Sequence, residues 1–175
     1  MAEREALAQM IATLPVALPR HIVQTPAEAE PIDLESLRTA NLYFLIMGAD
    51  IRAPVGLELH TAQQAGQSVA AYFKQNIPYT PAGQVFTRQA RLNWQPFSDA
   101  TNLSRQIRQI IVKYLLQQAI TYALTPTEIA QLERIQHTPE PQEQNAQAEG
   151  TGHSAVLLSP ERYIPSEGII VEESH

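Results

Sequence analysis

The sequence predicts a mainly α-helical fold: a small, helical bundle-like domain with at most a minor β element, flanked by flexible acidic tails. Three observations support this. Apolar residues recur at helical spacing in several segments, capping residues precede some of these segments, and both ends are rich in acids and prolines. We therefore divide the chain into an N-terminal helix with a proline-rich connector (1–30), a helical core domain (31–137), and a disordered acidic linker with a short C-terminal motif (138–175).

The N-terminal third predicts two helices and a connector. Residues 2–14 place Leu7, Met10 and Ile11 on one helical face, and Pro15 ends that helix. Four prolines then predict an extended connector up to Pro31. Asp33 is a suitable N-cap for a helix that Gly48 would stop. The second half of that segment, 41–48, is apolar enough to be a buried strand instead.

The central third predicts a helix and a weak β signal. Thr61 and Gln64 have the spacing of a capping box, which predicts a helix over 62–77 that Pro78 closes. In 84–95, apolar and polar residues alternate, which weakly favours a strand or hairpin arm over a helix.

The longest helix is predicted over 100–124, beginning after Ser98 or Asp99. Its inward residues would be Leu103, Ile107, Ile110, Ile111 and Tyr114. Thr125, Pro126 and Glu128 form the clearest start signal of a further helix. Beyond it, residues 138–153 carry almost no apolar side chains, so we expect disorder.

Composition excludes several classes of protein. The 175 residues contain no cysteine, which removes disulfide scaffolds, thiolate metal sites and cysteine nucleophiles. No apolar run approaches the roughly 20 residues that span a bilayer, and the N-terminus lacks the features of a signal peptide. We expect a cytoplasmic protein without membrane insertion.

Catalytic motifs are scarce. Glycine-rich nucleotide loops, G-x-S-x-G and H-E-x-x-H are all absent, and we expect no cofactor and no metal. Glu58 and His60 would share a face of an extended segment, with Asp50 nearby in sequence. An enzyme with a site near Asp50, Glu58 and His60 is therefore one hypothesis. The simpler interpretation is that His60 precedes a helix and Glu58 is solvated.

Positive charge is concentrated in the middle of an acidic chain whose formal net charge is −6. Residues 38–127 hold eight cations against three acids, and aromatic rings lie among the cations of the window 85–114. Cations that pair with phosphates beside rings that stack on bases are typical of nucleic-acid contact. An acidic protein, the chain's own tail or solvent could meet them equally well. The predicted anion-binding residues are Arg88, Arg91, Trp94, Arg105, Arg108 and Lys113.

The C-terminal segment favours a tethered motif. Ile169, Ile170 and Val171 are β-branched and flanked by acids, which suits addition as a strand to the sheet edge of a partner. Alternatively, the segment folds back as a strand against the chain's own residues 86–93.

Together these observations predict a non-enzymatic accessory or adaptor subunit of a larger macromolecular assembly, a nucleoprotein assembly included. Its basic mid-chain surface would meet an anionic partner, either a protein subunit or nucleic acid, and its acidic ends would tether or tune assembly. A dedicated nucleic-acid-binding protein that uses 85–114 and the enzyme described above are the alternatives.

Overall fold

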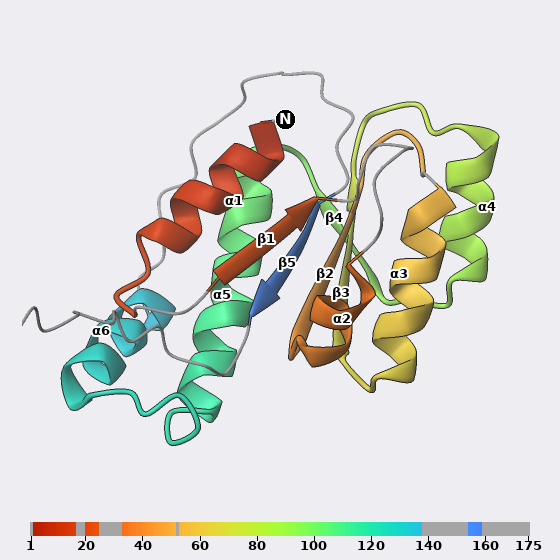
Figure 1. Ribbon diagram of the computed structural model, residues 1–175. Helices are drawn as coiled ribbons and strands as arrows, with labels where there is room; N and C mark the ends of the chain where they lie inside the picture. Colours follow the sequence, from red (N-terminus) through yellow and green to blue (C-terminus); the bar gives the residue numbers. More distant parts are fainter. Residues whose placement is uncertain (1, 17–19, 25–32, 52, 138–153, 159–175) are drawn as a thin grey trace, which may run out of the picture.

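The computed structural model describes residues 2–16, 20–24, 33–51, 53–137 and 154–158. In these residues a parallel β-sheet carries helices on both faces (Figure 1). The elements in chain order are α1 (Ala2–Ala12), β1 (Arg20–Gln24), α2 (Leu34–Thr39), β2 (Leu42–Met47), α3 (Ala53–Gln64), β3 (Ser68–Lys74), α4 (Pro81–Gln89), β4 (Trp94–Phe97), α5 (Ala100–Gln117), α6 (Pro126–His137) and β5 (Ser154–Leu158).

The predicted mainly α-helical, bundle-like fold is wrong, because a parallel sheet organises the core. Its strand order is β2-β3-β4, with Phe44 opposite Ala70 and Tyr72 opposite Gln95. Helices α3 and α4 are the crossovers between successive strands and lie on one face together with α2 (Figure 1). Helices α1 and α5 cover the other face, and α6 packs on α5. The chain is therefore a mixed α/β protein.

Strand β2 settles the alternative left open for residues 41–48. All six of its side chains are buried, because a parallel strand covered by helices on both faces needs no polar side. The predicted cap Asp33 is confirmed: its side chain accepts a hydrogen bond from the Ser36 amide at 3.0 Å. The helix that it caps is only α2, which ends at Thr39.

The helix predicted over 62–77 is wrong. Helix α3 begins at Ala53, with Pro54 in its first turn, where proline costs no hydrogen bond. It ends at Gln64, and Gly66 follows with φ of 70°, a conformation that glycine adopts easily. Thr61 caps nothing, because its hydroxyl donates to the Leu57 carbonyl inside α3 at 2.9 Å.

The strand favoured over 84–95 is also largely wrong. Most of this segment belongs to α4, and only its last residues join β4. Thr80 caps α4 by accepting a hydrogen bond from the Gly83 amide at 3.1 Å, and Pro81 follows as the first helical residue.

The last two helices follow the prediction more closely. Asp99 caps α5 by accepting from the Asn102 amide at 2.8 Å, but α5 ends at Gln117 rather than at residue 124. In α6 the capping box is confirmed, because the Thr125 amide donates to the Glu128 carboxylate at 2.7 Å and the Glu128 amide donates back to the Thr125 hydroxyl at 3.3 Å.

The sheet separates two apolar clusters. Leu42, Phe44 and Ile46 of β2 pack towards α1 and α5, whereas Tyr43 and Leu45 pack towards α2 and α3. Burial on both faces holds the helices in place through the hydrophobic effect.

The β1–β5 pair is a second, two-stranded antiparallel sheet that lies beside β2 (Figure 1). Strand β1 falls within the predicted extended connector. The predicted disordered linker 138–153 lies outside the described residues. In the part of the chain that the structure describes, no helix combines the length and apolar character needed to cross a membrane.

Candidate functional site

Glu58 is a buried carboxylate on the sheet-facing side of α3. Val55, Leu59 and Ala62 form the apolar stripe of this helix, and all three are buried. Glu58 occupies the i+3 position of the same stripe and is only 3% exposed. The sequence therefore places an acid where an apolar side chain is the norm.

Tyr43 of β2 is a hydrogen-bond donor to this carboxylate. Its hydroxyl lies 3.5 Å from Glu58 Oε2, at the long end of hydrogen-bond distances. Burial, and then the negative charge of Glu58, raise the pKa of Tyr43 well above its usual range. Tyr43 therefore stays protonated, so that it remains a donor to the carboxylate.

The carboxylate of Glu58 reaches Tyr43, which is the second residue of β2. Helix α3 follows β2 and runs back alongside it, so its N-terminus lies at the end where β2 finishes (Figure 1). Side chains on a helix tilt towards its N-terminus. Glu58 stands on the second turn, so it lies about one helical turn from the edge where α3 begins.

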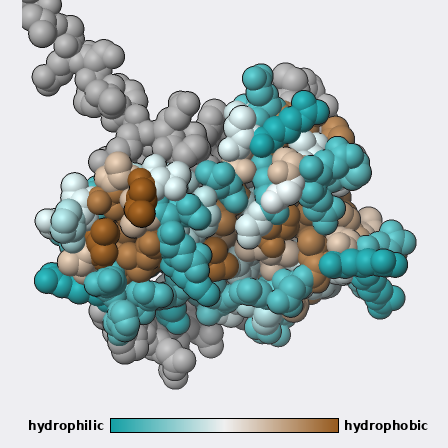
Figure 2. Space-filling model, turned by 90° about the horizontal axis from the view of Figure 1, so that it is seen from below, coloured by the Kyte–Doolittle hydropathy of each residue, from teal (hydrophilic) through white to brown (hydrophobic). Residues whose placement is uncertain are grey.

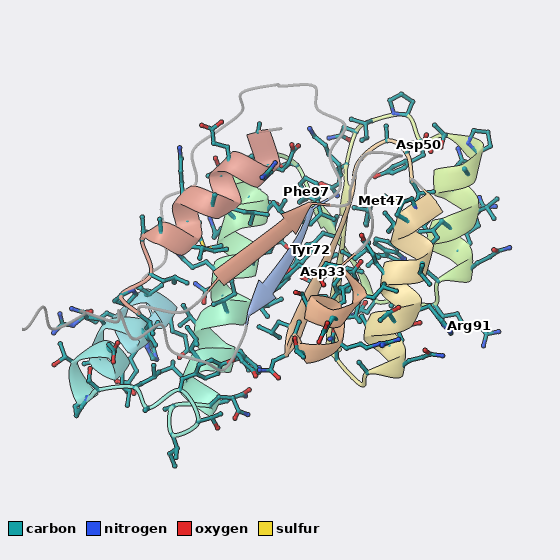
Figure 3. All side chains as sticks on the ribbon, in the orientation of Figure 1. Asp33, Met47, Asp50, Tyr72, Arg91 and Phe97 are labelled. Atoms are coloured by element: carbon teal, nitrogen blue, oxygen red, sulfur yellow. The ribbon has the colours of Figure 1, made fainter. Side chains whose placement is uncertain are left out.

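Asp50 lies at that edge, in the loop after β2 (Figure 3). Its carboxylate accepts a hydrogen bond from the Ile51 amide at 2.8 Å and a second one from the Thr80 hydroxyl. The Thr80 amide donates to the Ala49 carbonyl at 3.0 Å. These bonds join the loop after β2 to the loop after β3, and Asp50 itself is exposed.

The side chains of His60 and Glu58 do not lie on the same face of the structure. The predicted proximity assumed an extended segment, but both residues lie on α3, where two positions correspond to a rotation of about 200°. His60 is exposed whereas Glu58 is buried. The simpler interpretation of Glu58 as a solvated acid is also wrong.

The end of β3 carries a buried ion pair at the same edge. Lys74 Nζ lies 3.0 Å from Glu3 Oε1 of α1, and the two side chains are 9% and 7% exposed. The Tyr79 hydroxyl donates to the Lys74 carbonyl. This pair holds the first turn of α1 on the sheet.

The residues of the basic window divide between the two faces of the sheet. Arg88 lies on α4, and Arg91 follows it on the same side as α3 (Figure 3). Lys113, Arg105 and Arg108 belong to α5 on the opposite face (Figure 1). The six predicted anion-binding residues therefore do not lie on one face of the fold.

Two members of the window have structural contacts. Arg108 donates to the Thr13 hydroxyl at 3.0 Å, which links α5 to the end of α1. Trp94 is half-buried, donates from its indole nitrogen to the Thr87 carbonyl at 3.1 Å and packs edge-to-face on Phe86. Trp94 thus anchors β4 to α4.

The predicted partner-binding residues Ile169, Ile170 and Val171 lie outside the described residues. The earlier apolar cluster of the tail forms β5, which pairs with β1. Residues 86–89 belong to α4 and residues 90–93 connect α4 to β4, so this segment is not the strand that the fold-back alternative required.

Exposed apolar side chains are scattered. Leu57 on α3, Val85 on α4 and Ile120 after α5 are 48%, 50% and 96% exposed. The face seen from below in Figure 2 shows apolar areas between polar ones. Single exposed apolar residues are common on protein surfaces and indicate no partner by themselves.

The fold and the buried Glu58–Tyr43 pair define an open parallel α/β protein with a carboxylate between a crossover helix and the sheet. No match for the chain emerges from comparison with protein-family models, curated proteins or solved structures. Among the described residues, no group of three or more histidine, aspartate or glutamate side chains is arranged to hold a metal ion.

Proposed function

We propose that the protein is an enzyme that binds a small organic molecule at the carboxyl edge of β2, β3 and β4, with Glu58 as its acid–base or nucleophilic group. The observation that carries this proposal is the burial of the Glu58 carboxylate on the sheet-facing stripe of α3, next to the Tyr43 hydroxyl.

The position of Glu58 between a helix and the sheet supports a functional role. Removing an ionised carboxylate from water is expensive unless polar partners compensate for the lost hydration. An apolar residue at this position would pack beside Val55 and Leu59 without that cost. Buried acids with a specific hydrogen-bond partner in the fold are candidates for active-site groups.

The topology supports the carboxyl edge as the binding region. Open α/β sheets bind ligands outside the carboxyl ends of their parallel strands, which is an argument from fold analogy. Asp50 is exposed at this edge and held by Thr80 and the Ile51 amide. Carboxylates accept hydrogen bonds, so Asp50 and Glu58 together favour a ligand that is rich in hydroxyl or amino groups.

The experiment compares wild type with Glu58→Gln and with the control Glu35→Gln, which makes the same change at an exposed position on α2. The full chain is incubated with nucleosides, sugars and amino acids, and binding and turnover are followed by ligand NMR. We expect Glu58→Gln to lower turnover by about 10²- to 10⁴-fold, with Glu35→Gln close to wild type.

One result would contradict the proposed role of Glu58. A ligand that Glu58→Gln binds and converts as fast as wild type would exclude Glu58 from the chemistry. Thermal unfolding of all three proteins shows whether any loss of turnover comes from loss of the fold.

The predictions of an adaptor subunit and of a nucleic-acid-binding protein stay predictions. Their common basis was one basic surface over 85–114, and the division of these residues between two faces weakens it. We therefore place the enzyme hypothesis first, with His60 removed from its site.

A further inference from the structure

Strand β5 fills a position that the fold leaves open. β2 is an edge strand of the parallel sheet, and the β1–β5 pair lies beside it (Figure 1). All six β2 side chains are buried. An open edge on so apolar a strand would be a template for another chain, so the neighbouring strands protect it.

The pairing of β5 with β1 is regular but short. Five residues of each strand face each other, from Arg20 opposite Leu158 to Gln24 opposite Ser154. A two-stranded pair has little stability of its own in water, so its persistence depends on contact with the rest of the domain. Strand β5 therefore depends on its contacts with β1 and β2.

The sequence between α6 and β5 is long enough for β5 to reach a second copy of the chain. Sixteen residues separate His137 from Ser154, and none of them is Val, Ile, Leu, Met, Phe, Trp or Tyr. A segment of that length spans at most about 55 Å.

We propose that β1 is a strand-acceptor site and that β5 of a second copy of this chain occupies it in exchange for the chain's own β5. Exchange leaves every β1–β5 contact chemically unchanged, which makes it a low-cost route to a dimer. The intramolecular strand competes at an effective concentration in the millimolar range. Exchanged dimers therefore increase as the protein concentration approaches that range.

The absence of cysteine from the chain allows a direct test. Ile22 faces Val156 across the pair, and opposite residues in antiparallel strands lie about 4.5–5.5 Å apart at Cα, within reach of a disulfide. Full-length Ile22→Cys and Val156→Cys proteins are mixed at micromolar to millimolar concentrations and oxidised with glutathione disulfide, which accepts the two electrons. Mass spectrometry then measures the covalent heterodimer.

We expect the heterodimer yield to rise several-fold across this concentration range. The double variant Ile22→Cys/Val156→Cys should close within one chain in dilute solution. The same single and double cysteine variants are made at Val23 and Ala155, the next pair along the two strands. Successive pairs in antiparallel strands alternate between hydrogen-bonded and non-hydrogen-bonded geometry, and the side chains are closer in the second kind.

The control mixes Ile22→Cys with Leu158→Cys, which stands two residues out of register. The proposal would be overturned by two results together. The heterodimer yield would be no higher than in this control mixture, and a double variant would still form its disulfide within one chain efficiently. These results would show that β5 stays with its own copy. Failure of both double variants to close would refute the β1–β5 pairing itself. Neither result bears on Glu58.

Discussion

The buried Glu3–Lys74 pair gives the sharpest stability prediction. At 3.0 Å and an effective dielectric constant near 20, the attraction between the two charges is about 5 kcal/mol. Desolvation costs several kcal/mol for each ion and cancels much of this gain. The pair as a whole therefore contributes little net stability, while removal of one partner leaves the other charge buried without it.

The perturbation is a double-mutant cycle of Lys74→Met, Glu3→Leu and both together. We expect each single variant to lower the free energy of unfolding by about 3–5 kcal/mol, and the double variant to lie within about 1 kcal/mol of wild type. Because Leu7 and Ile11 of α1 are fully or almost fully buried, detachment of α1 would disrupt the core.

Urea unfolding followed by circular dichroism measures these free energies, provided that the m-value stays constant. The exposed residues Glu5 and Lys113 supply controls: Glu5→Leu and Lys113→Met should each change stability by less than about 0.5 kcal/mol. If Lys74→Met cost no more than Lys113→Met, our account of how α1 is held on the sheet would be wrong.

Two further predictions concern the core. Ile111→Ala should lower the free energy of unfolding in urea by about 2–5 kcal/mol, because Ile111 is fully buried. The control Ile120→Ala should lower it by less than about 0.5 kcal/mol, because Ile120 is 96% exposed. Equal losses of stability in the two variants would contradict the assigned face of α5. The Tyr72 hydroxyl is buried without a hydrogen-bond partner among the described residues, so Tyr72→Phe should leave stability at pH 7 unchanged or raise it by about 1 kcal/mol. Burial raises the pKa of Tyr72 from 10.0 to about 12, so wild type should lose about 2 kcal/mol more than Tyr72→Phe as pH rises from 10 to 12. Parallel pH profiles of the two proteins would refute that assignment.

Local signals in the sequence predicted what local contacts determine. The caps at Asp33, Asp99 and Thr125 are formed within three residues of each helix start, so their residue types suffice to identify them. Ile107 and Ile111 follow the period of an amphipathic helix and are fully buried. These features could be predicted because no distant residue decides them.

The sheet could not be predicted from such signals. The apolar run of β2 has no alternation, because helices cover both of its faces. Strand β3 lies in an alanine-rich stretch that resembles a helix, and only its pairing with β2 and β4 makes it a strand. The start signal that was missed is Pro54, in the first turn of α3.

The candidate site was predicted in part. Glu58 and Asp50 were selected because of their spacing from His60, but the structure buries Glu58 on a helix and leaves His60 exposed. Once α3 is known, the signal is an acid at the i+3 position of an apolar stripe. Tyr43 was missed because it lies in the preceding strand, and only the fold brings it within 3.5 Å of Glu58.

The central claim, a ligand site at the carboxyl edge beside Glu58, is tested most directly by amide chemical-shift mapping. The full-length, isotopically labelled protein is titrated with the compound from the panel that binds most tightly. Our account predicts that the largest shifts fall in Met47–Ile51 and along the first two turns of α3, and that Glu58→Gln weakens binding or removes these shifts. Shifts confined to Arg88 and Arg91 or to α5, and unchanged in Glu58→Gln, would contradict it.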